Sequence, residues 1–228
     1  MSVYKIIEII EAEHEIYEIL KYCPYEILKQ FSIKEYKKGK FILKQDEIYD
    51  SFYIIVEGFV DIYVMSENGK KYSLTTYKKG NYIGEHEIFD QKPFSCSAEA
   101  ISDIKLLELN RSHFLKWFSI DRNLNEYITK TLCSQFYSLS KKAGKDALYT
   151  LKQRICKYLI DNLIKSNNKE MLKINIEKEK LSEQMAVTQR SVNRVLKNLK
   201  EQDIIDIHNN YIIIKDLNLL KSEADIVD

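Results

Sequence analysis

The segment that most constrains the fold of this chain is residues 180–214, which has the pattern of a helix, a tight turn, a second helix and a hairpin. From Gln184 to Lys200 this segment has no acidic residue, although the whole chain carries 35 basic and 34 acidic side chains. The chain as a whole has a net charge of only +1, so the four basic residues of this acid-free stretch form a local concentration of positive charge. It predicts a surface that contacts a nucleic-acid duplex.

The second helix of this segment has two chemically different faces. Its apolar residues are spaced 0, +3, +4 and +7, so they must face a core: Val192, Val195, Leu196 and Leu199. The opposite face carries Gln189, Arg190, Asn193, Arg194 and Lys197. Arginine pairs with guanine, and glutamine or asparagine with adenine, in the major groove. A solvated charged face is the simpler interpretation of one isolated helix, but the turn, the cap and the hairpin favour a recognition helix.

Two local signals mark the boundaries of this element. Thr188 has the chemistry of an N-cap, because its hydroxyl can accept from the backbone N–H of Arg190 or Ser191. Residues 204–208 and 211–214 flank Asn209 and Asn210, and asparagine tolerates the left-handed conformation of a two-residue hairpin turn. We therefore predict a two-stranded wing. Its tip could contact a phosphate or simply close the small domain.

Length and composition exclude several classes of protein. With 228 residues the chain has room for one large or two modest domains. It has no apolar run of membrane-span length and no signal-peptide pattern at its start, so we expect a cytoplasmic protein with no membrane contact. The sequence shows no nucleophile–base pair, metal-ligand spacing or phosphate-cradling glycine loop, which predicts no enzyme, no catalytic residue, no metal and no cofactor. Its four scattered cysteines predict buried, reduced thiols.

The first half of the chain has the pattern of a β-structure. Five of the six glycines fall between residues 39 and 84, among short apolar runs. The strand-length runs are residues 41–43, 52–56, 60–64, 72–77, 96–100 and 104–109. Short strands at this spacing predict a closed antiparallel barrel or roll. Amphipathic helices are expected before it, at 3–21 and 25–31, and a short helix after it, at 111–120.

A long helix is predicted over residues 121–148, because one apolar stripe persists along it. The stripe consists of Ile128, Leu132, Phe136, Leu139 and Ala143. A helix of this length spans roughly 40 Å at 1.5 Å per residue, which is more than one small roll can cover. The stripe therefore predicts a homodimer whose two copies pack along it. Thr150 then caps a further helix at 151–165.

Taken together, these segments resemble the cyclic AMP receptor protein/fumarate–nitrate regulator (CRP/FNR) superfamily over nearly the whole chain. The motifs that carry the resemblance are YIIVEG in the roll, GE opening the ligand segment, KQRICKYL after the hinge and TQRSVNR in the recognition helix. The resemblance implies an α+β fold with an antiparallel β-roll of the cyclic-nucleotide-binding, cupin-type jelly-roll kind in residues 1–120. A long dimerisation helix and hinge would follow in residues 121–149, and a winged helix-turn-helix in residues 150–228.

The resemblance also implies partners and roles for individual residues. The partners would be a palindromic DNA operator, a second copy of the chain, RNA polymerase and a small-molecule effector. Gln189, Arg190 and Asn193 would take the base-reading positions, and Arg194 the position of a guanine-reading arginine. Phosphates would be held by Thr188, Ser191 and Lys178, and Lys197 lies on the same face.

The effector site is where the sequence departs from the family. Gly84 and Glu85 open the ligand segment, but Phe94 or Ser95 stands where cyclic-nucleotide binders have a phosphate-clamping arginine, and Cys96 follows. Residues 1–110 contain no arginine at all, so a bidentate guanidinium clamp is missing from the roll. Lys92 could offer only a point charge. We therefore predict no binding of cyclic AMP or cyclic GMP at micromolar concentration.

Several alternatives stay open from the sequence. Counting back from Arg154 places Leu139 where the long helix would meet a purine, and Asp46 stands where the family has a glycine. His86, with Cys96 nearby, is the one candidate for a haem-type sensor, whereas scattered cysteines argue against an iron–sulfur cluster. The effector could be a small apolar or weakly polar ligand, a protein, or nothing. The roll could also be a ligand-binding or protein-interaction module with a vestigial helix-turn-helix.

Overall fold

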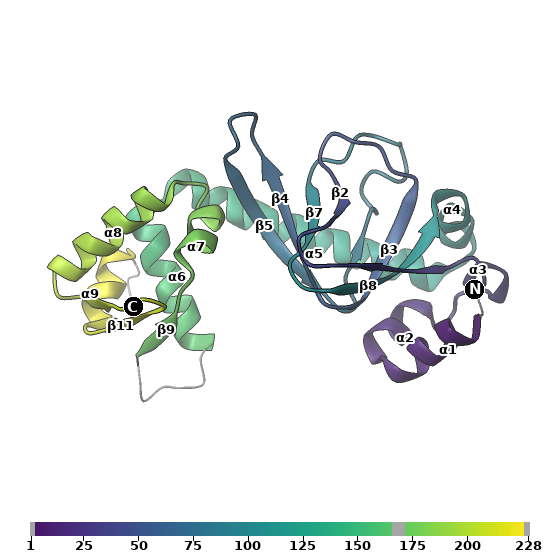
Figure 1. Cartoon of the computed structure of the whole chain (residues 1–228), viewed down its shortest axis with the longest axis horizontal. Coiled ribbons are helices and arrows are strands. Elements are labelled where there is room, and N and C mark those ends of the chain that lie inside the picture. The colour runs from purple at the N-terminus through teal and green to yellow at the C-terminus, as the bar shows by residue number, and fades with distance from the viewer. Residues whose placement is uncertain (1–2, 166–171, 226–228) are drawn as a thin grey trace. The chain divides into compact units, whose positions relative to one another are not determined.

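The computed structural model describes residues 3–165 and 172–225, which form two compact units (Figure 1). One unit contains Met1–Gly69 and Ser73–Gln135, and the other contains Lys70–Tyr72 and Phe136–Asp228. The long helix α5 (Arg122–Leu148) is divided between them after Gln135. None of the helices in the described ranges is long and apolar enough to cross a membrane.

The first unit is a roll of two four-stranded sheets. In one sheet the order is β1 (Ser32–Tyr36), β8 (Ile104–Asn110), β3 (Ser51–Glu57), β6 (Tyr82–Ile83). In the other the order is β2 (Phe41–Leu43), β7 (Ser97–Ala100), β4 (Phe59–Met65), β5 (Lys71–Lys78). The pairs β1–β8, β3–β8, β3–β6, β2–β7 and β4–β7 run antiparallel, which confirms the predicted antiparallel roll.

Strand β3 separates two apolar cores, because its side chains alternate between its faces. Tyr53 and Ile55 join a core that contains residues of both sheets and therefore lies inside the roll. Phe52 and Ile54 join a second core, which the helices of this unit cover. Since both faces are buried, the run from Phe52 to Val56 is continuously apolar.

Four short helices and the first half of α5 cover the second core. The short ones are α1 (Val3–Ala12), α2 (His14–Leu20), α3 (Tyr25–Leu28) and α4 (Arg111–Ile120). The prediction of a single helix at 3–21 was wrong, because Glu13 has an extended backbone with φ −126° and ψ 103°. The break allows Ile6 of α1 and Ile16 of α2 to reach the same core. The predicted helix at 111–120 is confirmed as α4.

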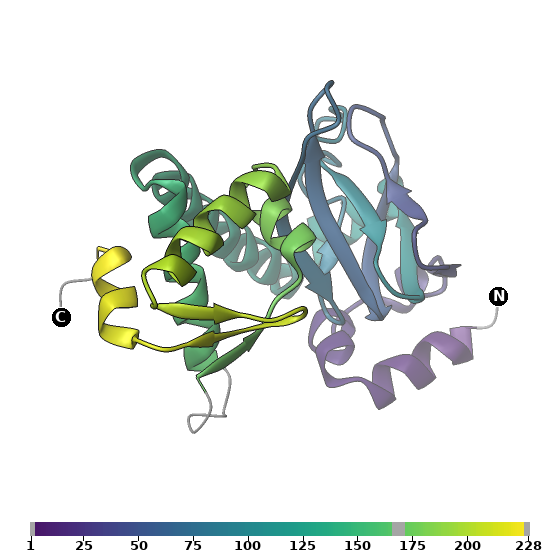
Figure 2. The same ribbon diagram turned by 60° about the vertical axis from the view of Figure 1, so that its left-hand side comes forward.

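The second unit holds a helix-turn-helix and a small sheet (Figure 2). Its helices are α6 (Leu151–Lys165), α7 (Lys178–Gln184), α8 (Gln189–Glu201) and α9 (Leu217–Glu223). Its strands are β9 (Lys173–Asn175), β10 (Ile205–Ile207) and β11 (Tyr211–Ile214), in the order β10-β11-β9. The predicted two-stranded wing is confirmed as the antiparallel pair β10 and β11, and β9 adds a third strand that was not predicted. Ile174 of β9 lies opposite Ile212 of β11, and a three-residue strand with one buried residue gives too weak a pattern to predict.

The turns at Gly58 and Asp46 have a residue with a positive φ, and a third turn that was predicted to have one does not. Gly58 has φ +89°, and a Cβ there would lie 2.4 Å from the carbonyl oxygen of Asp103, so only glycine fits. Asp46 has φ +66°, which explains why a glycine is customary at this position. The prediction of left-handed residues in the Asn209-Asn210 turn was wrong, since neither has a positive φ. The His208 N–H instead donates to the Tyr211 carbonyl at 2.9 Å and closes the turn without that conformation.

The four free cysteines differ in exposure. Cys156 is buried, and burial raises the pKa of its thiol to about 12. Cys23 and Cys96 are partly buried, and burial raises the pKa of the Cys23 thiol to about 12 as well. Cys133 on α5 is exposed, so the prediction of four buried thiols was wrong at this position. Position on a helix face, rather than residue type, decides its exposure.

Candidate functional site

Helix α8 begins where its sequence predicts. The hydroxyl of Thr188 accepts a hydrogen bond from the Ser191 backbone N–H at 3.2 Å, which confirms the N-cap. Val192, Leu196 and Leu199 are at most 1 % exposed and pack in the core of the second unit. The apolar stripe thus fixes which side of α8 faces outwards.

The outward side of α8 is polar and basic. It presents the exposed side chains of Gln189, Arg190, Asn193, Arg194 and Lys197. Within the part of the chain that the structure describes, neither Arg190 nor Arg194 has an ion-pair partner, whereas Lys197 Nζ lies 3.6 Å from Glu201 Oε1. The positive end of the helix dipole lies at the same end as these arginines. This surface can therefore bind an anion with groups that are not already in use.

The other predicted phosphate contacts lie in the same unit. Lys178 is the first residue of α7 and is half-buried. The hydroxyls of Thr188 and Ser191 lie 3.0 Å apart at the start of α8. The structure therefore places all eight predicted DNA-contacting residues in one compact unit, on or beside its two helix-turn-helix elements.

Arg154 of α6 supports the turn before α8, a role that the sequence alone did not indicate. Its Nη1 lies 2.8 Å from Asp146 Oδ1 and donates to the carbonyl of Met185 at 3.3 Å. Met185 is the C-cap residue that follows α7, and Ala186 in the turn after it has φ +53°. Arg154 thus connects the end of α5 with the turn that orients the recognition helix.

The predicted dimer stripe on α5 divides into two parts. Ile128 is 1 % exposed in the second core of the first unit, and Leu132 packs partly against the same core. Ile128 is therefore already used within one chain, because the first half of α5 covers the roll. Phe136 is 72 % exposed, Leu139 is 52 % exposed, and Ala143 is also exposed.

The ligand segment of the roll opens at Gly84 as the sequence requires. Gly84 has φ +99°, and a Cβ there would lie 2.6 Å from the Ser51 carbonyl oxygen. The next residue, Glu85, is only 2 % exposed, and burial raises the pKa of its carboxyl group above the ordinary glutamate value. A carboxylate held in this way is costly to ionise unless a ligand or a side chain bonds to it.

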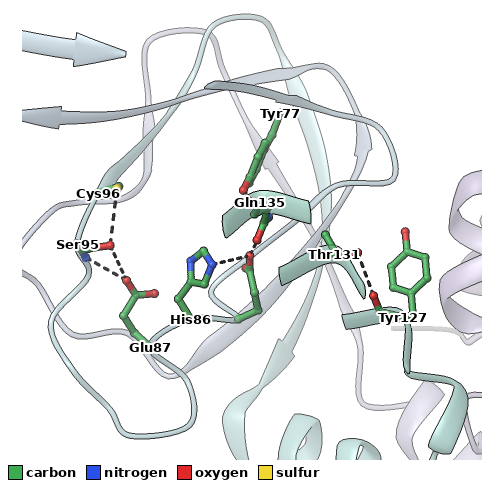
Figure 3. A network of polar contacts seen from close by, with 9 residues as sticks. Tyr77, His86, Glu87, Ser95, Cys96, Tyr127, Thr131 and Gln135 are labelled. Carbon is green, nitrogen blue, oxygen red and sulfur yellow. Dashed lines mark hydrogen bonds and ion pairs between the residues drawn. The ribbon is translucent and has the colours of Figure 1, made fainter. Parts of the chain in front are cut away.

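Gln135 of α5 meets Glu85 in a polar network (Figure 3). Its Nε2 donates to the Tyr77 hydroxyl at 2.8 Å and to Glu85 Oε1 at a long 3.4 Å. His86 Nε2 lies 3.7 Å from the same Glu85 oxygen. Within the described residues, the Gln135 Oε1 is buried and has no hydrogen-bond partner.

The α5 residue that contacts the ligand segment is therefore Gln135, which was not predicted from the sequence. Counting along the helix gave Leu139, one turn later, and this residue belongs to the other unit. A polar residue one turn earlier on the same helix face was the signal that could have identified it. The place of Leu139 beside a ligand stays a prediction.

The residues at the position of the family's arginine do not form a cationic site. Phe94 is 5 % exposed in the core inside the roll, with its ring 5.5 Å from Tyr49 in a T-shaped contact. Ser95 donates from both its backbone N–H and its hydroxyl to Glu87, and its hydroxyl lies 3.7 Å from the Cys96 sulfur. The roll thus presents a carboxylate where an anion-binding site would need positive charge.

Two cationic side chains of the neighbouring sequence, Lys92 and Arg111, are bonded to other groups. Arg111, the first arginine of the chain, donates from Nε to the Ile88 carbonyl at 2.6 Å and from Nη2 to the Phe89 carbonyl at 3.0 Å. Lys92 is exposed and pairs with Asp90 at 2.7 Å. In the described ranges, no group of three or more histidine, cysteine, aspartate and glutamate residues could hold a metal ion.

Two family profiles match the chain, one over the roll and one over the helix-turn-helix. The Cyclic nucleotide-binding domain profile matches residues 33–121, and the Crp-like helix-turn-helix domain profile matches residues 153–223. The chain is 23 % identical over 192 residues to the cAMP-activated global transcriptional regulator CRP of Salmonella typhimurium, covering 82 % of this chain and 91 % of the relative. It is 21 % identical over 203 residues to the CRP-like cAMP-activated global transcriptional regulator of Mycobacterium tuberculosis, covering 87 % and 90 %.

Solved structures show the same fold. A transcriptional regulator of the crp/fnr family from Eubacterium rectale superposes with a TM-score of 0.71 at 14 % identity, covering 91 % of this chain and 97 % of that chain. The c-di-GMP responsive global regulator CLP of Xanthomonas campestris gives a TM-score of 0.72 at 15 % identity, covering 89 % and 99 %. With its roll, its helix-turn-helix and these relatives, the chain belongs to the CRP/FNR superfamily of transcription regulators.

Proposed function

We propose that this regulator binds a palindromic DNA operator as a homodimer and does so without cyclic AMP. The observation that carries the proposal is the outward face of α8. It combines a capped N-terminus, two arginines without ion-pair partners in the described structure and no acidic residue over seventeen positions, from Gln184 to Lys200. Such a face suits the major groove of a duplex.

Each residue on this face has a proposed role. Gln189, Arg190, Asn193 and Arg194 read base edges, because they lie in the first two turns and are exposed. Lys178, Thr188, Ser191 and Lys197 contact phosphates, which fixes the position of the helix but carries no sequence information. The amide groups at the start of α8 add to the phosphate contacts.

The proposed dimer seam is the exposed part of the α5 stripe. Phe136, Leu139 and Ala143 are spaced +3 and +4 along the helix and are exposed in the single chain. A two-fold axis along this seam would bring the same apolar surface of each copy together. Two recognition helices would then lie about 34 Å apart, one duplex turn.

Independence from cyclic AMP is proposed from the residues of the roll, and it departs from the activation that the names of the relatives state. Phe94 or Ser95 stands where the family has an arginine; Phe94 is buried, Ser95 bonds to Glu87, and Arg111 is occupied by two backbone carbonyls. Without a guanidinium to pair with it, a cyclic phosphate in this site stays costly to desolvate. Calorimetry with cyclic AMP and cyclic GMP tests this point, and a stoichiometric micromolar isotherm with either would contradict it.

DNA binding is tested by selecting an operator from a random duplex library and measuring its affinity by fluorescence anisotropy. Arg194→Ala should weaken binding to the selected operator by about 1–3 kcal/mol and relax one base position. Lys197→Ala is the matched control, because it should weaken selected and unrelated duplexes equally. Wild-type affinity of Arg194→Ala would refute the role of α8. Failure to select any duplex would favour an interaction module with a vestigial helix-turn-helix.

A further inference from the structure

The Ser95 backbone and side chain together form a pair of donors aimed at one oxygen. The Ser95 N–H lies 3.1 Å from Glu87 Oε1, and the Ser95 hydroxyl lies 2.9 Å from the same atom (Figure 3). Two donors that converge on a single carboxylate oxygen form the kind of contact by which proteins hold small oxyanions. The acceptor of both donors is the side chain of Glu87, which belongs to the same unit and lies eight residues earlier in the chain.

The Glu87 carboxylate depends on these donors. It is only 9 % exposed, so its charge is partly removed from water. The basic groups of the surrounding segment have other partners: Lys92 pairs with Asp90, His86 lies beside Glu85, and Arg111 donates to backbone carbonyls. Among the residues that the structure describes, the two hydrogen bonds from Ser95 are therefore the contacts to the Glu87 side chain that stabilise a charge on it.

We propose that Glu87 is an internal anion, which occupies an oxyanion site built by the Ser95 amide and hydroxyl and keeps free oxyanions out of it. Ser95 itself is exposed, so a small anion from solution can reach the donors once the carboxylate is absent. The inference rests on the proposed function only in treating the roll as the sensing part of the regulator. It explains how the segment folds without a phosphate-bearing ligand.

The direct test removes the carboxylate and returns it from solution. Glu87→Ala should lower the melting temperature by about 2–10 °C, because it leaves the Ser95 N–H without its acceptor. Acetate or formate should restore much of this loss in a saturable manner. Sodium chloride at the same ionic strength should not, because chloride has no oxygen geometry to match the two donors. The wild type should show no difference between acetate and chloride.

Three variants keep the test specific. Glu67→Ala removes an exposed carboxylate of the same unit and should show no acetate-specific shift, which controls for net charge. Glu87→Gln keeps an acceptor oxygen near Ser95 and should respond to acetate much less than Glu87→Ala. The double variant Glu87→Ala/Ser95→Ala loses the hydroxyl donor and should need several-fold more acetate for half of its shift.

An equal response of Glu87→Ala to acetate and chloride would overturn the proposal. If Glu87→Ala folds only with added anion, its refolding yield in acetate is compared with its yield in chloride. A higher yield in acetate would support the proposal, and equal yields would contradict it. None of these measurements contains DNA. A failure to bind an operator would therefore contradict the proposed function but not this inference. Equal responses to acetate and chloride would contradict this inference but not the proposed function.

Discussion

On α8, Arg190 and Arg194 extend into solvent, whereas in the roll Glu85 and Glu87 are turned inwards and are bonded to side chains or backbone of the same unit. The apolar residues differ in the same way. Phe136 of the second unit is 72 % exposed, but Phe94 of the roll is 5 % exposed. One unit leaves these arginine and phenylalanine side chains exposed to solvent, and the other bonds or packs the compared side chains within its own chain.

This difference in exposure indicates which groups can bind an external partner directly and which already have an internal partner. A group that is exposed and unpaired costs nothing to leave in water and is ready to bind. A buried group has already exchanged water for an internal partner, so a ligand must displace that partner before it can bind. The comparison therefore predicts that DNA and a second copy bind to the second unit more readily than an anion binds to the roll.

The largest expected effect comes from the exposed stripe of α5. Phe136→Lys should give monomers and weaken operator binding by about 100-fold or more, because each half-site would then be bound alone. Sedimentation velocity measures the assembly, and anisotropy measures the affinity. Tyr137→Lys is the matched control, since Tyr137 is also exposed but lies off the stripe. A dimeric Phe136→Lys protein would reject this seam and break the comparison.

The next largest effect is expected at Arg154. This residue is an exception to the comparison, because it lies in the second unit but is bonded to partners within its own chain. Arg154→Ala should destabilise this unit by about 1–3 kcal/mol, since Asp146 loses its ion pair and the Met185 carbonyl loses a donor. Lys197→Ala breaks the exposed pair with Glu201 and should cost about 0.5 kcal/mol or less. Urea denaturation of both variants decides the point, and equal costs would show that Arg154 is not a support.

Glu85 offers a test that depends on pH. Because burial raises the pKa of its carboxyl group in the folded state, the protonated form stabilises the fold at low pH, and this stability is lost as the pH rises above the ordinary value of 4.5. Glu85→Gln keeps a neutral group at every pH. Its stability relative to the wild type should therefore increase between pH 4.5 and pH 8. A difference that stays constant or shrinks over this range would mean that Glu85 is not penalised by burial.

The smallest effect concerns the turn before the recognition helix. Ala186 has φ +53°, a left-handed conformation that strains a residue with a Cβ. Ala186→Gly should stabilise the second unit by about 0.5 kcal/mol, after the greater freedom of glycine in the unfolded chain is subtracted. Operator affinity should stay unchanged. A loss of stability in urea would show that the turn tolerates alanine without strain.

The sequence predicted those elements whose pattern is local. Helix α8 follows from the cap at Thr188 and the buried stripe through Leu196, and strand β3 follows from a continuous apolar run. Strand β1 was missed because it has one aliphatic residue, Ile33, followed by the charged Lys34 and Glu35, and β6 because it has only two residues. Elements this short are defined by the strands that they pair with.

The polar groups of the roll could not be predicted as a network. Tyr77, Glu85 and Gln135 come from a strand, a turn and a distant helix, and their contacts depend on how α5 packs. The lack of arginine before residue 111 was visible in the sequence. That Glu87 would fill the donors of Ser95 was not, because the pairing depends on how the turn at 85–91 folds.

The bonds between Glu87 and Ser95 also set a concentration threshold. The carboxylate is tethered close to its donors, so it competes at an effective concentration that is on the order of millimolar even for a flexible tether, and higher for a folded turn. A free anion that binds the two donors as strongly as the carboxylate must exceed this concentration to occupy half of the sites. An anion that binds them more weakly needs a proportionally higher concentration. The wild-type roll should therefore ignore ordinary fluctuations in the pools of phosphate and organic acids around it.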